Sequence, residues 1–308
     1  MSDAGGWVAA DNALDGQHSL VSPDNISVAH FAPPAAIAPF ITQFYHFRCD
    51  QQHIRETQPA ALGQLTFLLS GQGVMKFVDG HIGEIHPATV YGPGTAHSEF
   101  TLKGPLDNVG AAFTPLGFVA LTGRPANHFA DRATPAGELF GPDMDMLAVR
   151  IREGRRSGAM PIAVIIEEIT KLLLLHVRPI APAHIRLIKT VGAWLSSEFG
   201  PDVDTLYAQL PMSRSTASRL ITRYFGSTPK AQMRKYRALR AATLLVDPST
   251  PPEVHTHIES QFYDQPHMIR EIRHFTGRTP RALDGDDARI LRIWLSKDNF
   301  RDLKAYPG

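Results

Sequence analysis

Two segments of the chain, about fifty residues apart, repeat one local pattern. Residues 213–226 and 264–277 each begin with a side chain that favours a helix N-terminus and end with a glycine that favours a helix stop. Each is followed by Thr-Pro, which favours the start of a further helix. Apolar residues recur at i, i+4 and i+7 in both, as in Ala217, Ile221 and Tyr224. The pattern predicts two similar helical units, joined by a helix over 230–246.

The opposite faces of these two predicted helices are polar and basic. The first carries Ser215, Ser218, Arg219 and Thr222, and the second carries Pro266, Ile269, Arg270 and Arg273. Arg219 and Arg270 occupy equivalent positions in the two patterns. These faces are therefore candidates for contact with a polyanion.

Basic charge is concentrated in the same part of the chain. Residues 184–281 contain 14 Lys and Arg against 8 Asp and Glu, whereas the whole chain has a formal net charge of +1. A basic block attracts nucleic acid because neutralised phosphates release their condensed counterions. A solvated surface is the alternative interpretation of the charge alone.

The two units closely resemble the C-terminal double helix-turn-helix domain of AraC/XylS-type transcriptional regulators. The resemblance covers roughly residues 184–283 and rests on Met-Ser-Arg at 212–214, Phe-Tyr-Asp-Gln-Pro-His-Met at 262–268 and His-Phe-Thr-Gly-Arg-Thr-Pro-Arg at 274–281. It implies a seven-helix domain that places two recognition helices in successive major-groove segments, about one helical turn of DNA apart.

The resemblance, together with side-chain reach, assigns roles in DNA binding. We expect Arg219 and Arg270 to donate paired hydrogen bonds to guanine edges, and basic residues around them to bind phosphates. For any single arginine, solvation or pairing with Glu259 or Glu271 is the alternative. The predicted DNA-binding residues are Ser213, Arg214, Ser215, Ser218, Arg219, Thr222, Arg223, Lys230, Lys235, Gln265, Pro266, Ile269, Arg270, Arg273 and Arg278.

Three features depart from the family pattern. Gln261 and the polar stretch 255–260 stand where the family has glycine and small apolar residues, and Pro211 stands where the first turn usually has glycine. Gln261 and the polar stretch predict poor packing of the helix before Phe262, which leaves DNA contact by the second module open, whereas proline is tolerable in a turn.

The N-terminal half has the pattern of a β domain. Its short apolar runs are separated by Gly and Pro, which indicates an antiparallel barrel or sandwich. Residues 90–93, 109–118 and 121–126 resemble the cupin-like N-terminal domain of a subset of the same regulators, which implies a small-molecule site at the barrel mouth. The predicted strands are 40–47, 65–69, 74–78, 89–91 and 109–113.

Beyond Arg132 the strand pattern stops, and helical periodicity follows in 142–156, 161–177 and 183–199. A last amphipathic helix over 286–297 is expected to pack on the DNA-binding domain or, alternatively, on a partner. The predicted organisation is a flexible arm at 1–25, a cupin-like effector and dimerisation domain at 26–177, a linker at 178–183, the double helix-turn-helix domain at 184–283, and a C-terminal amphipathic helix within 284–308.

Catalytic and metal chemistry receive little support from the sequence. Cys49 is the only cysteine, which excludes an intrachain disulfide and multi-cysteine metal centres. His81 and His86 lack the close His-x-His spacing of metal cupins, and the Gly-rich segments 70–73 and 92–94 lack the Lys-Ser/Thr of a phosphate loop. We expect no catalytic residue, metal or cofactor, and the effector-binding residues stay unassigned.

We interpret the chain as an α+β protein, with a cupin-like β-barrel followed by helices and an all-α double helix-turn-helix domain. The expected function is cytoplasmic, sequence-specific transcriptional regulation, with double-stranded DNA, a small-molecule effector and a second copy of the chain as partners. RNA polymerase is an additional candidate partner. No apolar run approaches the length of a membrane span. The alternative is a cupin-type binding protein or enzyme whose helical half no longer binds DNA, and a weaker one is an interaction protein that docks through 290–295.

Overall fold

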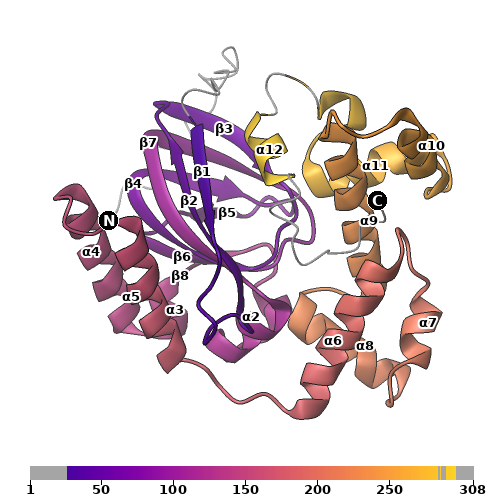
Figure 1. Cartoon of the computed structure of the whole chain (residues 1–308), viewed down its shortest axis with the longest axis horizontal. Helices are drawn as coiled ribbons and strands as arrows, with labels where there is room; N and C mark the ends of the chain where they lie inside the picture. The colour runs from indigo at the N-terminus through magenta and orange to yellow at the C-terminus, as the bar shows by residue number, and fades with distance from the viewer. Residues whose placement is uncertain (1–25, 284, 286–288, 296–308) are drawn as a thin grey trace.

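The computed structural model describes residues 26–283, 285 and 289–295. A bent β-sheet with its own helices forms the N-terminal half, and a group of helices forms the C-terminal half beside the rim of the sheet (Figure 1). The predicted arm at 1–25 and the outer parts of the predicted helix over 286–297 lie outside the described residues. None of the described helices is long and apolar enough to cross a membrane.

The sheet contains eight strands within the described residues, and all of its pairs are antiparallel. Its order is β1-β2-β7-β4-β6-β8, with β3 paired to β7 and β5 paired to β4. The strands are β1 (Ile26–Phe31), β2 (Ile41–Cys49), β3 (His53–Gln58), β4 (Gln64–Lys76), β5 (Ile82–Glu84), β6 (Ala88–Tyr91), β7 (Ser98–Phe113) and β8 (Ala133–Pro135). The predicted β domain is confirmed, and β8 extends it beyond Arg132.

The break predicted at residues 71–73 does not separate two strands. The runs 65–69 and 74–78, predicted as separate strands, lie largely within this single strand, because the glycines at 71 and 73 interrupt the ladder without ending it. The register with β7 shifts on both sides of Ser70, and Gly71 has a φ of 92°. The glycine pair therefore marks an irregularity that bends a long strand.

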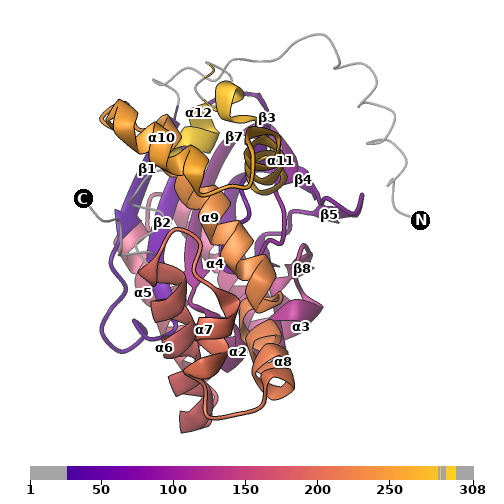
Figure 2. The same cartoon turned by 90° about the vertical axis from the view of Figure 1, so that its right-hand side faces the viewer.

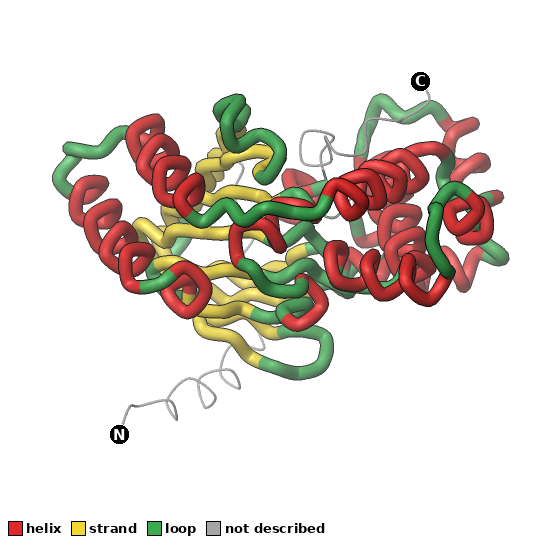
Figure 3. The backbone as a smooth tube through the Cα atoms, turned by 90° about the horizontal axis from the view of Figure 1, so that it is seen from below, coloured by secondary structure: helices red, strands yellow, loops and turns green. Residues whose placement is uncertain are grey.

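The two faces of the sheet have different environments. In β4, Leu65 and Phe67 belong to the core shared with the helices, whereas Gln64 and Thr66 point to the other side, as the two-residue period of a strand requires. Helices α4 and α5 pack beside the sheet (Figures 1 and 3). The helical elements of this half are α2 (Pro115–Thr122), η3 (Ala126–His128), α3 (Ala136–Phe140), α4 (Pro142–Arg156) and α5 (Ile162–Leu175).

The C-terminal half consists of two helical modules that share one long helix. Helix α9 supplies Tyr236 to the core of the first module and Leu239 to the core of the second, and it runs between the two in Figure 2. The elements are α6 (Pro182–Ser197), α7 (Val203–Ala208), α8 (Arg214–Phe225), α9 (Pro229–Val246), α10 (Pro252–Ser260), α11 (Gln265–Thr276), η4 (Pro280–Ala282) and α12 (Arg289–Trp294). The predicted connecting helix and both repeated helices are confirmed.

Helix α10 packs despite its polar sequence. Ile258 is fully buried, and the Phe262 ring that follows is buried beneath the Arg237 guanidinium, whose carbon lies 4.8 Å from the ring centroid. The expectation of poor packing is wrong at these residues, because one aliphatic side chain and one aromatic ring suffice to attach so short a helix.

Helix α12 packs on the second helical module, as the first predicted alternative states, and it also contacts the β domain, which the sequence did not predict. Leu291 and Leu295 belong to the core of the second module, whereas Ile290 belongs to the barrel core. The Trp294 ring lies 5.3 Å from the Phe100 ring and 6.4 Å from the Phe47 ring, measured between centroids. This short helix therefore bridges the barrel and the second helical module.

A buried ion cluster joins α9 to α11. The Glu271 side chain is 1% exposed, and it accepts hydrogen bonds from Arg237 at 2.5 and 3.0 Å and from Arg234. Removing one partner of a buried pair leaves the other charge desolvated without compensation.

We predict that Glu271→Ala destabilises the protein by about 3 kcal/mol, because the guanidinium of Arg237 would lose its buried carboxylate. The measurement is chemical unfolding of the full chain, followed by the helical signal. Glu259→Ala is the matched control, because Glu259 is exposed on α10 and should change stability little. Equal stability of the Glu271 and Glu259 variants would contradict a structural role for the cluster.

Candidate nucleic-acid interface and ligand cavity

Helix α8 is defined by local capping at both ends. The Ser213 hydroxyl accepts a hydrogen bond from the Thr216 backbone N–H at 3.3 Å, and Gly226 ends the helix with a φ of 85°. Ala217, Ile221 and Tyr224 are buried in the first module, as the sequence predicts. The opposite face carries predicted DNA-binding residues that are exposed, namely Arg214, Ser215, Arg219 and Arg223, and two that are half-buried, namely Ser218 and Thr222.

Helix α11 repeats this construction. The Asp264 carboxylate accepts a hydrogen bond from the His267 N–H at 2.6 Å, and Gly277 ends the helix with a φ of 81°. Met268, Ile272 and Phe275 are buried in the second module. The exposed face carries Gln265, Pro266, Ile269, Arg270 and Arg273. The structure thus brings each predicted set together on one exposed helix face.

Two predicted phosphate contacts are wrong for this structure. Lys235 is 3% exposed, and its ammonium donates to the backbone oxygen of Gly94 at 3.1 Å, so it faces the barrel and not solvent. Arg278 donates to the buried Glu56 carboxylate on β3 at 3.2 Å. Both side chains hold the helical half against the barrel, whereas Lys230 lies exposed at the start of α9.

The C-terminal ends of α8 and α11 contact the barrel rim. Past the end of α8, a side chain at Gly226 would meet Pro93, whose ring carbon lies 2.5 Å from an ideal Cβ position. At the end of α11, the backbone oxygens of His274 and Phe275 accept the N–H groups of His97 at 3.0 Å and Ala60 at 2.8 Å. The rim segments 58–62 and 92–97 therefore touch the helical half at several points.

Glu56 is held in an unfavourable environment for its charge. Burial raises the pKa of its carboxyl, while the Thr57 backbone N–H and the Arg278 guanidinium act in the opposite direction. The ion pair with Arg278 thus compensates a carboxylate that β3 buries at the edge of the barrel. This pairing ties the segment after α11 to the N-terminal half.

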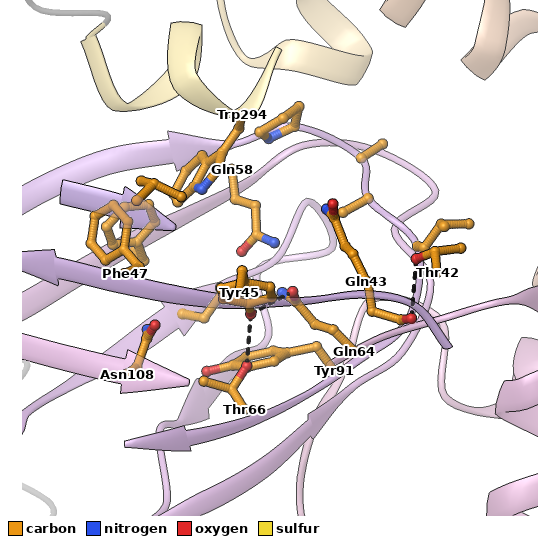
Figure 4. A pocket seen from close by; sticks show the side chains of 18 of the residues that line it. Thr42, Gln43, Tyr45, Phe47, Gln58, Gln64, Thr66, Tyr91, Asn108 and Trp294 are labelled. Carbon is orange, nitrogen blue, oxygen red and sulfur yellow. Dashed lines mark hydrogen bonds between the residues drawn. The ribbon is translucent and has the colours of Figure 1, made fainter. Parts of the chain in front are cut away.

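A cavity of about 160 Å³ lies inside the barrel, on the face of the sheet opposite α4 and α5. Its walls come from β1, β2, β4, β6 and β7, from the rim segment 58–62, and from α9 and α12. Figure 4 shows Trp294 on the α12 side and Tyr45, Gln64 and Thr66 grouped deeper in the cavity. The cavity therefore includes residues of both halves of the chain.

Tyr45 organises the polar part of the cavity. Its hydroxyl donates to the Gln64 amide oxygen at 2.8 Å and lies 3.1 Å from the Thr66 hydroxyl. A Cβ at Gly110 would lie 2.1 Å from the Tyr45 ring, so glycine is needed where the ring crosses β7. Burial raises the pKa of Tyr45 to about 12, and the phenol is therefore neutral over the physiological range.

Sequence analysis did not identify these cavity residues. The available signal was the polar residue at alternate positions of otherwise buried strands, as in Gln43 and Tyr45 on β2 and Gln64 and Thr66 on β4. The same alternation is typical of a solvent-facing sheet, so it identifies a cavity only once the opposite wall of the barrel is known.

Comparison with known proteins finds two matching domain families. Residues 206–285 match a helix-turn-helix domain of the AraC type, and residues 29–135 match a domain of unknown function, DUF6597. No curated relative matches the chain.

The solved structures that the chain matches include ToxT from Vibrio cholerae, which is 8% identical and has a TM-score of 0.43, with 89% of this chain and 99% of that one covered. A further ToxT structure, bound to (E)-4-(8-methylnaphthalen-1-yl)but-3-enoic acid, is 8% identical with a TM-score of 0.44 over 88% and 100%. The AraC-like transcriptional activator CuxR is 14% identical with a TM-score of 0.31 over 70% and 94%.

The contact between α11 and the rim should weaken in acid. Burial lowers the pKa of His274, assisted by the charges of Arg234 and His97, while the Thr95 backbone and Asp131 oppose the shift. Because the folded state favours the neutral ring, its contribution to stability is present above the ordinary histidine pKa of about 6.5 and is lost as the pH falls through the lowered value.

We therefore predict that thermal stability falls more steeply below about pH 6.5 in the parent chain than in His274→Gln, which cannot be protonated. The measurement is the melting temperature of both proteins across this range. Parallel pH profiles of the two proteins would contradict the role given to His274.

Proposed function

We propose that this chain, whose residues 206–285 are a helix-turn-helix domain of the AraC type, is a transcriptional regulator that binds specific DNA sequences and responds to a small molecule in its barrel cavity. The observation that carries the proposal is the pair of exposed, basic recognition faces on α8 and α11. Within the described part of the chain both faces are exposed, although the ends of the two helices are docked on the barrel.

The two recognition helices support equivalent modes of base contact. Arg219 and Arg270 are each the sixth residue after the helix N-cap, and both are exposed. A guanidinium on such a face donates two hydrogen bonds to the O6 and N7 atoms of guanine. Arg223, Arg273 and Lys230 surround these positions with positive charge for phosphate binding. We assign the base-reading role to Arg219 and Arg270.

The cavity supports a route from effector to DNA. The rim segment 58–62 lines the cavity and also contacts α11 through the N–H of Ala60. Lys235 of α9 lines the cavity as well and binds Gly94 in the second rim segment. A ligand that moves this wall changes the contacts of both modules, and differential binding to the two arrangements would shift their populations.

We further propose that the protein acts in the cytoplasm as a homodimer, without enzymatic activity of its own, and that RNA polymerase is a partner at its target sites. Support for self-association comes from apolar side chains left exposed on the N-terminal helices. Leu175 is 81% exposed, Met146 61% and Val149 54%.

The test of this function is selection of DNA from a random-sequence duplex library by the full chain, with a salt titration of the selected site. We expect a motif with two sub-sites about one helical turn apart and an affinity that falls steeply with salt. A motif with one sub-site would limit base reading to one module. Recovery of no motif, with and without barrel ligands, would reject the function.

We predict that Arg219→Ala and Arg270→Ala each weaken binding to the selected site by roughly 1–3 kcal/mol and relax the preference at one base position. The loss follows from removing two hydrogen bonds to one guanine. Competition binding against a panel of single-base variants measures both effects.

Arg152→Ala is the matched control for both substitutions. Arg152 is exposed on α4, at the far side of the molecule from α8 and α11 in Figure 1, so its loss should leave the base preference unchanged. An unaltered base preference in the Arg219 or Arg270 variant would remove that residue from the base-reading role.

A further inference from the structure

The cavity walls combine aromatic rings with neutral polar groups. Phe47, Phe100 and Trp294 form an aromatic cluster at one end, and the Tyr45 ring lies further inside (Figure 4). Aromatic walls of this kind favour a flat apolar body, which packs against them by stacking or edge-to-face contact. The walls therefore fit a ring better than a flexible polar chain.

The cavity offers little to a charged ligand. Apart from the imidazole of His30, the described residues that line it include one ionic side chain, Lys235. Its ammonium already donates to Gly94 and lies 5.6 Å from the Tyr236 ring centroid. The remaining polar groups are amides and hydroxyls, and burial keeps the Tyr45 and Tyr91 phenols neutral by raising their pKa. A carboxylate placed among them would lose its hydration without gaining a new counter-charge.

One buried hydrogen-bond acceptor in the cavity wall has no donor among the described residues. The Oδ1 atom of Asn108 is buried and has no hydrogen-bond partner among the described residues. Asn108 lies on β7, opposite Phe47 of β2 and Leu68 of β4, and all three residues line the cavity. Because a buried acceptor without a partner is costly, a ligand N–H or O–H that reaches it gains a hydrogen bond and relieves that cost.

The volume limits the size of the ligand. At about 160 Å³ the cavity is close to an engineered apolar cavity of about 150 Å³ that holds benzene. A single substituted ring fits this space, whereas a long chain or a fused ring system requires the walls to move.

We propose that the barrel cavity binds an uncharged, single-ring molecule that carries one hydrogen-bond donor directed at Asn108. This assignment rests on the proposed function, in which the cavity is the effector site. The effector's ring would pack against the aromatic walls, and its neutral hydrogen-bond donor would reach the Oδ1 atom of Asn108. It would carry no ionised group.

Benzamide and benzoate form a matched pair of probes, because they share size and shape and differ in charge and in the N–H donor. Isothermal titration of the full chain at neutral pH is expected to show benzamide binding at least about tenfold more tightly than benzoate. Benzoate binding as tightly as benzamide, or more tightly, would overturn the proposal. Failure of benzamide to bind would overturn it as well.

The variant Asn108→Leu tests whether the Asn108 side chain accepts a hydrogen bond from the ligand. We expect it to weaken benzamide binding about tenfold while leaving toluene, which has the ring and no donor, with unchanged affinity. Retained toluene binding shows that the cavity is intact in the variant. Asn127→Leu, at an exposed position outside the cavity, is the control and should bind benzamide as the parent chain does. Undiminished benzamide affinity in Asn108→Leu would reject the role of Asn108.

The experiments test the proposed function and the ligand assignment independently of each other. The ligand titrations contain no DNA, and the duplex selection scores DNA binding without any assumption about the ring. A selected DNA motif without benzamide binding would reject the ligand assignment alone, whereas benzamide binding without any motif would reject the regulatory function alone.

Discussion

The docking of the helical half on the barrel rim is the constraint that the rest of the arrangement depends on. The backbone oxygens of His274 and Phe275 accept N–H groups from His97 and Ala60, and Lys235 binds the Gly94 carbonyl. Carbonyls in the last turn of a helix have no partner within the helix, so the rim satisfies groups that would otherwise need water. The same contacts fix how α9 and α11 sit on the rim, and α9, which contributes to the cores of both modules, connects α11 to α8.

The position of the cavity follows from this docking. The second helical module and α12 close the open side of the barrel, and Trp294 completes the aromatic wall. The wall of the ligand site and the support of the DNA-binding helices are thus partly the same residues. A ligand that moves this wall would therefore change the domain contact directly.

Features set by short-range interactions were predictable from the sequence. The caps at Ser213 and Asp264 bond groups three residues away, and the stripes that α8 and α11 bury depend on one helix period. Lys235 and Arg278 were misassigned because their partners, Gly94 and Glu56, lie 141 and 222 residues away along the chain. A surface lysine and an interface lysine have the same local sequence, and only the fold distinguishes them.

The cavity was hidden from sequence analysis for a related reason. Gln64 and Thr66 alternate with Leu65 and Phe67, as they would in a sheet with one solvent-exposed face. The bend of the sheet and the covering residues of α9 and α12 enclose that polar face, where each amide and hydroxyl needs a partner. Tyr45 satisfies Gln64 and Thr66, whereas no described residue satisfies the Oδ1 atom of Asn108. The unmet acceptor is therefore a product of the fold, and it marks the position in the cavity where a ligand's donor belongs.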